Sequence, residues 1–258
     1  MRVKRIELFE FEDLPWLPTA WRNLQTDFLR QMSTALHLYE PVVPLIDSAL
    51  ARSASRRVVD LCSGAAGPWE QLLKRGWEVA VTLTDRYPNV EAFTRMKKLG
   101  AGRIDYRADP VDARQVPAEL AGMRVMFNGF HHFRPEHARN ILADAAARRI
   151  PIGIFEIAEL TFPKLLAVLV GVPLLALLLT PFIQPFRFSR LLWTYCLPVV
   201  PACLLWDGLA SLLRAYTPAQ LAELADAAGS DGYRWETGRI APPFPGVAIT
   251  YLIGQPED

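Results

Sequence analysis

The sequence has few residues of the kinds that build disulfide scaffolds and metal centres. It holds three cysteines and four histidines among 258 residues, and no cysteine lies near a histidine in the chain. Cysteines this few and this scattered predict neither a disulfide framework nor a zinc site. We therefore expect no bound metal and a reduced, cytoplasmic environment.

The sequence also lacks an excess of charge, a signal peptide and repeats. Lys and Arg number 28 against 27 Asp and Glu, and a net charge of +1 gives no reason to expect a nucleic-acid partner. Residues 1–13 are charged and contain no apolar run of the kind that a signal peptide requires. A chain that is 51% hydrophobic at this length predicts one large domain, or one domain with an insertion.

The stretch Arg56–Trp69 has the pattern of a strand, a turn of small residues and a helix. Val58–Cys62 is apolar apart from Asp60, the following residues are all small, and a helical pattern comes next. Small residues let the backbone approach a ligand, and a helix N-terminus presents free N–H groups to it. The pattern is typical of a nucleotide-binding unit. It is not the dinucleotide fingerprint, because Cys62 and Ala66 occupy positions where glycines are expected.

This turn resembles the first motif of class I S-adenosylmethionine-dependent methyltransferases, in the variant D-x-C-S-G-x-x-G. The resemblance implies S-adenosylmethionine as the cofactor. It places the methionine end of the cofactor among Asp60, Cys62, Ser63, Gly64 and Gly67. Alone, the turn is equally compatible with a tight strand–helix connection in another α/β protein.

An acid at the end of the next predicted strand extends the implied site. The β-branched run Glu78–Asp85 ends in a carboxylate that can accept both ribose hydroxyls of a nucleoside. Arg86 follows it and is grouped with it as a cofactor contact. The alternative for Asp85 is a helix cap or turn residue.

The adenine end is implied by a loop that follows a third strand at Arg103–Arg107. In the resembled family an acid, a small residue and then a Val-Pro or Leu-Pro pair lie beside the adenine. Asp112 and Ala113 fit that pattern here, and Asp109 in the same loop is the competing acid. The fourth predicted strand ends at Asn128, which the resemblance adds to the cofactor contacts.

A histidine-rich turn follows that strand. The plant-type O-methyltransferases carry a general base in a run that is similar to His131, Phe133, Glu136 and His137. The resemblance implies that His131, with His132 in reserve, removes a proton from an oxygen acceptor, because an imidazole titrates near neutral pH. The alternative is that these histidines cap or pack. We expect no metal here, because adjacent side chains point in different directions and no third ligand is evident.

The remaining core pattern completes an α/β sheet. Pro151–Ile157 predicts a fifth buried strand. A capped helix begins after Thr217, and Tyr233–Ile240 and Val247–Gly254 predict two closing strands. The fold class implied is a Rossmann-like, mostly parallel, seven-stranded class I methyltransferase sheet.

Two further segments flank or interrupt that core. A helical pattern from Thr19 to Tyr39 predicts an N-terminal layer, which is either a packing layer or a lid over the site. Leu165–Ile183 and Leu191–Trp206 are apolar runs without charge, broken by prolines. They predict a helical cap over a greasy acceptor pocket, an element lying in one leaflet of a membrane, or a spanning hairpin.

The leaflet interpretation carries expectations for particular side chains. It places three aromatic residues at the membrane interface and four cations near lipid headgroups: Trp193, Tyr195 and Trp206, with Lys164, Arg187, Arg190 and Arg214. Spanning is disfavoured because Arg187 and Arg190, in the connecting turn, would have to cross the bilayer. The leaflet and cap interpretations both predict an apolar or lipid-like acceptor.

Together these observations predict a lid at residues 1–55, a methyltransferase core at 56–159 and 216–258, and an apolar insertion at 160–215. The function implied is methyl transfer from S-adenosylmethionine to a hydrophobic small molecule or lipid. The alternative is a non-catalytic, membrane-associated nucleoside-binding protein. We expect a cytoplasmic location, peripheral to the inner membrane face if the leaflet interpretation holds. The sequence does not indicate the oligomeric state.

Overall fold

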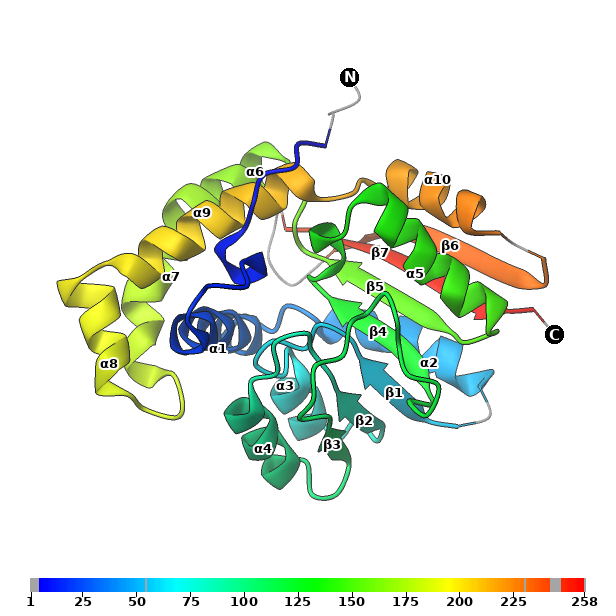
Figure 1. Ribbon diagram of the computed structural model, residues 1–258, viewed down its shortest axis with the longest axis horizontal. Helices are drawn as coiled ribbons and strands as arrows, with labels where there is room; N and C mark the ends of the chain where they lie inside the picture. The colour runs from blue at the N-terminus through cyan, green and yellow to red at the C-terminus, as the bar shows by residue number, and fades with distance from the viewer. Residues whose placement is uncertain (1–4, 54, 230, 242–246, 258) are drawn as a thin grey trace.

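The apolar runs predicted as strands pair into one seven-stranded sheet with helices on both faces (Figure 1). The computed structural model describes residues 5–53, 55–229, 231–241 and 247–257. The strand order is β3-β2-β1-β4-β5-β7-β6. The bounds are β1 (Arg57–Asp60), β2 (Ala80–Leu83), β3 (Ile104–Tyr106), β4 (Met123–Phe127), β5 (Ile152–Glu156), β6 (Tyr233–Ile240) and β7 (Ile249–Pro256).

The pairing confirms the predicted mostly parallel sheet. Strands β1 to β5 pair in parallel with one another, whereas β7 runs antiparallel between β5 and β6. Every residue of β4 and β5 is buried, as expected of central strands covered on both faces. The carboxyl ends of β1, β2 and β4 therefore share one edge, where ligands bind in folds of this kind.

Two apolar layers hold the helices to the sheet. On one face, α2 (Val43–Ala51), α3 (Trp69–Lys74) and α4 (Val90–Leu99) contribute to one core cluster. On the other face, α5 (Pro135–Ala147) and α10 (Pro218–Ala228) contribute to a second. Helix α10 begins with the predicted cap, since the side chains and backbones of Thr217 and Gln220 hydrogen-bond reciprocally.

The N-terminal helix and the insertion form a third apolar cluster beside the sheet. Helix α1 (Thr19–Ala35) packs on α7 (Val172–Leu179) and α9 (Val199–Arg214). The buried members of this cluster are Leu24, Phe28, Ala176, Ile183, Val200 and Leu204. Figure 1 shows the insertion as a helical arm at the side of the sheet, with α1 between the arm and the core.

The first arm of the insertion is one helix from Phe162 to Phe182. It comprises α6 (Phe162–Leu166), a π-helical stretch (Ala167–Gly171), α7 and a 3-10 turn (Thr180–Phe182). Among the described residues it is the one unbent helix long and apolar enough to cross a membrane. Only 11% of its apolar stretch is buried, unlike a core helix of a soluble protein. The second arm joins α8 (Phe188–Leu191) and a π-helical stretch (Leu192–Cys196) to α9 with a bend of 73°.

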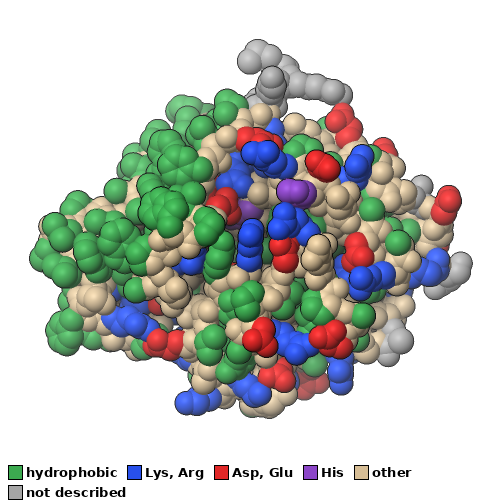
Figure 2. Space-filling view, in the orientation of Figure 1, with side chains coloured by type: hydrophobic (Ala, Val, Ile, Leu, Met, Phe, Trp, Pro, Cys, Tyr) green, Lys and Arg blue, Asp and Glu red, His purple; other side chains and the backbone are tan. Residues whose placement is uncertain are grey.

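The outer side of this insertion is a broad apolar surface. Figure 2 shows hydrophobic side chains gathered over these helices, while the rest of that view is mixed in charge. The large exposed side chains include Phe162, Leu166, Val170, Leu174, Leu178, Phe182, Phe188 and Leu192. Soluble monomers rarely leave so much contiguous apolar surface in water.

Three of the four cations of the insertion do not lie where the leaflet interpretation placed them. Arg190 is 1% exposed and its Nη2 lies 2.7 Å from Oδ2 of Asp27 in α1. Lys164 is also buried and donates to the carbonyl of Ala248. These side chains turn inward, where acids and carbonyls of the protein supply the partners that a buried cation needs. Arg214 is buried as well.

Candidate functional site

A cavity of about 420 Å³ opens at the carboxyl edge of the sheet, with residues of α1 on its wall. All of the predicted cofactor contacts except Asp60 line it: Cys62, Ser63, Gly64, Gly67, Asp85, Arg86, Asp112, Ala113 and Asn128. His132 also lines it, and His131 is not among the described residues that do. The residues from these motifs therefore line one cavity, with Asp60 and His131 outside it. That they contact a cofactor stays a prediction.

The turn after β1 is tightly wound. Cys62, Gly64, Ala66 and Gly67 all have positive φ angles of 44° to 77°. Two of them are not glycine, and a left-handed conformation is uncommon for such residues. The backbone N–H of Gly67 donates to the carbonyl of Ser63 at 3.1 Å, which closes the turn. The turn presents backbone and small side chains to the cavity, as a close-fitting ligand requires.

Asp60 lies behind this turn rather than on the cavity. Its Oδ2 accepts a hydrogen bond of 2.7 Å from Nε1 of Trp69, and it is 1% exposed. Burial raises the pKa of Asp60 to about 7, although the hydrogen bond from Trp69 opposes that shift. The prediction that Asp60 surrounds the methionine end is corrected to this extent: its carboxylate packs against the turn from inside the core.

Asp85 bridges the turn and the loop after β2. Its Oδ2 accepts from the N–H of Gly64 at 2.8 Å, and its Oδ1 accepts from the N–H of Tyr87 at 2.7 Å. Burial raises the pKa of Asp85, while the two backbone N–H groups lower it. Each carboxylate oxygen has a further lone pair, so Asp85 can still accept from a bound ligand.

In the loop after β3, the predicted adenine contact Asp112 already has a partner within the protein. Both carboxylate oxygens of Asp112 are held by the guanidinium of Arg114, with a shortest distance of 2.5 Å. The side-chain hydrogen bonds from Arg114 lower the pKa of Asp112. An adenine amine would therefore share this carboxylate with Arg114, which also lines the cavity.

The side chain of Asn128 accepts hydrogen bonds from the backbone that follows β5. It adopts φ of 50° at the end of β4, and its Oδ1 accepts from the N–H groups of Ile157 and Ala158 at 3.1 and 3.2 Å. It thereby joins the ends of β4 and β5 beside the cavity.

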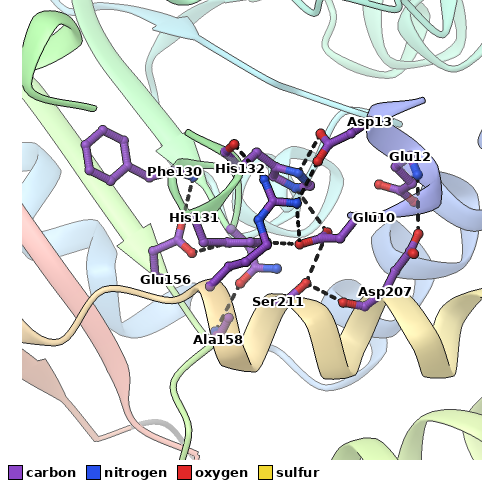
Figure 3. A network of polar contacts seen from close by, with 12 residues as sticks. Glu10, Glu12, Asp13, Phe130, His131, His132, Glu156, Ala158, Asp207 and Ser211 are labelled. Atoms are coloured by element: carbon purple, nitrogen blue, oxygen red, sulfur yellow. Dashed lines mark hydrogen bonds and ion pairs between the residues drawn. The ribbon is translucent and has the colours of Figure 1, made fainter. Parts of the chain in front are cut away.

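The two histidines lie in a polar network (Figure 3). The Nδ1 of His131 is 2.5 Å from Oε2 of Glu156, and the Nδ1 of His132 is 2.9 Å from Oδ1 of Asp13. Their rings are 4.4 Å apart and inclined by 31°. The prediction that the two side chains point in different directions is wrong, as the positions of their Nε2 atoms show. Both Nε2 atoms face the carboxylate of Glu10, at 3.7 Å for His131 and 3.6 Å for His132.

His131 is poorly placed to be the base. Its side chain is buried, and although burial lowers its pKa, the carboxylates of Glu156 and Glu10 raise it to about 10. A protonated, enclosed imidazole cannot take a proton from an acceptor in the cavity. His132 is the imidazole of the pair that the cavity reaches.

Apart from Glu156 of β5, the carboxylates around the histidines come from an N-terminal segment that the motifs did not reveal. The 3-10 turn Phe11–Asp13 brings Glu12 and Asp13 to the cavity wall. Asp207 of α9 accepts from the N–H groups of Phe11 and Glu12 at 2.7 and 3.3 Å. The guanidinium of Arg214, also on α9, lies 2.6 Å from Oδ2 of Asp13. The acidic cluster near the N-terminus was the one signal available in the sequence.

The insertion itself supplies no wall of the cavity among the described residues. The lining residues fall before Asn140 in the chain, apart from Ile157. The apolar lining comes instead from α1, the loop after it, strand β4 and the residue that follows the 3-10 turn Phe130–His132: Leu29, Met32, Leu38, Tyr39, Phe127 and Phe133. The expected cap over an acceptor pocket is therefore not how the insertion is arranged around this cavity.

The sequence matches no family model and no curated protein. Among solved structures, an O-methyltransferase family 2 protein from Planctomyces limnophilus, in complex with apigenin, aligns with a TM-score of 0.52 and 15% identity, over 92% of this chain and 62% of that one. The plantazolicin methyltransferase in complex with SAH aligns with a TM-score of 0.51 and 12% identity, over 93% and 88%. An O-methyltransferase family protein from Burkholderia thailandensis has 16% identity and a TM-score of 0.44, and this chain covers 56% of its length. The chain has the fold of class I methyltransferases.

Proposed function

We propose that this protein transfers a methyl group from S-adenosylmethionine to a hydrophobic small molecule or lipid, at an oxygen atom. The observation that carries the proposal is the cavity at the carboxyl edge of a methyltransferase sheet, where the wound turn after β1 meets the carboxylate of Asp85. This arrangement supplies close backbone approach for the methionine end and a hydrogen-bond acceptor for the ribose.

The cofactor contacts are assigned by their position on the cavity. Ser63, Gly64 and Gly67 face the methionine end, Asp85 and Arg86 the ribose, and the loop at Asp112 and Ala113 the adenine. Cys62 and Asn128 keep the turn and the ends of β4 and β5 in place, and Asp60 supports the turn from behind. Most of the rate would come from holding the acceptor oxygen in line with the methyl group.

The acceptor is assigned to the part of the cavity between His132 and the apolar lining. His132 is 22% exposed there, and its Nδ1 is held by Asp13, which leaves Nε2 as the nitrogen nearest to an acceptor hydroxyl. Leu29, Met32 and Phe133 line the same cavity. A polar group beside apolar walls suits a hydrophobic molecule with one reacting hydroxyl.

We propose further that the insertion rests in one leaflet of a membrane. Its outer face exposes Phe162, Phe182 and Phe188 by 78%, 68% and 80%, and these side chains do not serve the cavity. Spanning would pull the insertion away from α1 and separate the buried pair Arg190–Asp27. Because three of the four cations are buried, attachment should depend on apolar contact more than on anionic lipid.

Two measurements test these proposals. Calorimetric titration of S-adenosylmethionine, followed by transfer of labelled methyl into a lipid extract, separates an enzyme from the alternative: a non-catalytic protein would bind the cofactor and never transfer. Flotation with neutral liposomes tests the leaflet. Replacing Phe182 and Phe188 by Ser should abolish flotation, whereas Leu99→Ser, an exposed apolar residue of α4, should leave it unchanged. A wild-type protein that ignores liposomes refutes the leaflet proposal and leaves the methyl-transfer proposal standing.

A further inference from the structure

Glu10, His131 and His132 form a cluster whose convergence the methyl-transfer proposal does not require (Figure 3). One ligand atom from each lies within 4.8 Å of the other two. Glu10 lies just ahead of the 3-10 turn near the N-terminus, and the histidines lie on the 3-10 turn Phe130–His132. Three side chains from two distant segments thus aim at a single point.

Each imidazole is oriented by a carboxylate through its other nitrogen. Glu156 holds Nδ1 of His131, and Asp13 holds Nδ1 of His132, at 2.5 and 2.9 Å. Histidines that bind metals usually donate the second N–H to such an outer carboxylate, which sets the direction of the ligating nitrogen. Here both Nε2 atoms are directed towards the Glu10 carboxylate.

The centre of this cluster lacks hydrogen-bond partners. Oε1 of Glu10 and Nε2 of His131 are buried without a hydrogen bond in the described structure. Their residues are 2% and 1% exposed. Oε1 of Glu10 has an ion-pair partner, the Arg214 guanidinium at 3.2 Å, whereas Nε2 of His131 lies 3.7 Å from that same oxygen. Buried polar atoms in folded proteins nearly always have a partner, so Nε2 of His131 points to a group that belongs between it and Glu10.

The charges around the cluster favour a cation. The guanidinium of Arg214 lies 3.2 Å from Oε1 of Glu10 and 2.6 Å from Oδ2 of Asp13. The third carboxylate, Glu156, lies 2.5 Å from Nδ1 of His131. One arginine does not balance three carboxylates.

We propose that Glu10, His131 and His132 bind one divalent transition-metal cation. Two imidazole nitrogens and one carboxylate oxygen are a donor set that suits Zn²⁺ or Fe²⁺, whereas Mg²⁺ and Ca²⁺ prefer oxygen. His132 lines the cavity. A nitrogen that binds the cation cannot also accept a proton, so with the cation bound the acceptor oxygen would be activated by the cation in place of Nε2 of His132; that last step rests on the proposed function. The proposal differs from the expectation, drawn from the sequence, that no metal binds.

The test measures the metal itself. Tag-free protein is stripped with a chelator, dialysed, and titrated with Co²⁺ as a spectroscopic probe and with Zn²⁺ in competition. Metal content is measured by mass spectrometry. We expect one cation per chain in wild type, and at least tenfold weaker binding in Glu10→Gln and in His132→Asn. The matched control is His137→Ala, which removes a histidine that lines the cavity outside the cluster and should bind as wild type does.

Circular dichroism checks that each variant is folded, and His132→Asn, on the cavity side, stands in if Glu10→Gln does not fold. Absence of a stoichiometric cation in wild type, or equal binding by all four proteins, overturns the site. A protein that binds the cation but never transfers methyl refutes the proposed function alone. Full methyl transfer by metal-free protein overturns the role of the cation towards the acceptor.

Discussion

Replacing Asp85 by Asn tests the cofactor site most directly. The change keeps the size of the side chain and removes its negative charge. In the native protein Oδ2 accepts from the N–H of Gly64 at 2.8 Å and Oδ1 from the N–H of Tyr87 at 2.7 Å. The remaining lone pairs are the ones that we assign to the ribose hydroxyls. In the variant an amide NH₂ replaces one oxygen, and it cannot accept a hydrogen bond from the backbone N–H or from a ribose hydroxyl.

The expected loss follows from the hydrogen bonds involved. A hydrogen bond to a charged group contributes about 1.5–3 kcal/mol, and at least one from the ribose is lost or loses its charge assistance. At 1.36 kcal/mol per factor of ten, the affinity for S-adenosylmethionine should fall roughly 10- to 150-fold. The N–H left facing the amide should also lower the free energy of unfolding by about 1–3 kcal/mol.

Calorimetric titration of S-adenosylmethionine measures the affinity, and urea unfolding measures the stability separately. The matched control is Asp105→Asn, an exposed acid on β3 that pairs with Lys97, which should leave the affinity unchanged. Gly64→Val provides a second test of the same site, because Gly64 has φ of 55°, a conformation that β-branched residues rarely adopt. Unchanged affinity in both Asp85→Asn and Gly64→Val would show that the cofactor binds elsewhere.

Three other predictions concern single groups. His132→Ala should lower turnover roughly 100-fold or more and leave calorimetric cofactor affinity intact; full turnover would remove this residue from the reaction. Asp27→Ala should lower the free energy of unfolding by about 3–5 kcal/mol, because it leaves the buried Arg190 unpaired; urea unfolding that matches wild type would contradict the buried pair. Burial raises the pKa of Asp60 from 3.8 to about 7, so the native state retains a proton that the unfolded chain releases, and this residue makes stability fall between pH 4 and 7. The free energy of unfolding of Asp60→Asn, relative to that of wild type, should therefore rise by up to about 4 kcal/mol from pH 4 to pH 8. If urea unfolding gives the same difference between the two proteins at both pH values, the raised pKa of Asp60 is refuted.

The core of the fold was predictable because its signals are local. Each parallel strand is a short apolar run, and its end is marked by a residue that changes the chemistry, such as Asp60 or Asp85. In a parallel sheet such ends gather at one edge, so motifs far apart in sequence could be placed together. The same reasoning does not show on which side of the sheet edge a side chain lies. It therefore did not predict that Asp60 lies behind the turn or that His131 lies behind His132.

The polar network was not predictable for a different reason. Glu156 reads as the last residue of a buried strand, and Glu10 and Asp13 belong to an acidic segment without a motif. Their carboxylates meet the histidines only through tertiary packing, across 25 or more positions of the chain. Likewise the sequence predicted that Arg190 and Lys164 contact lipid headgroups, because it does not show that acids and carbonyls of other segments pair with them in the folded protein.

The insertion serves the site without forming any of the cavity wall. Helix α9 ends its apolar stretch with Asp207 and Arg214, and these two side chains hold the backbone of Phe11 and Glu12 and the carboxylate of Asp13. Asp13 in turn holds the imidazole of His132. An insertion that only attached the protein to a membrane could be removed without affecting the cavity. Removing this one would release the N-terminal acids and leave His132 without its partner, so the apolar surface and the polar cluster belong to a single structural unit.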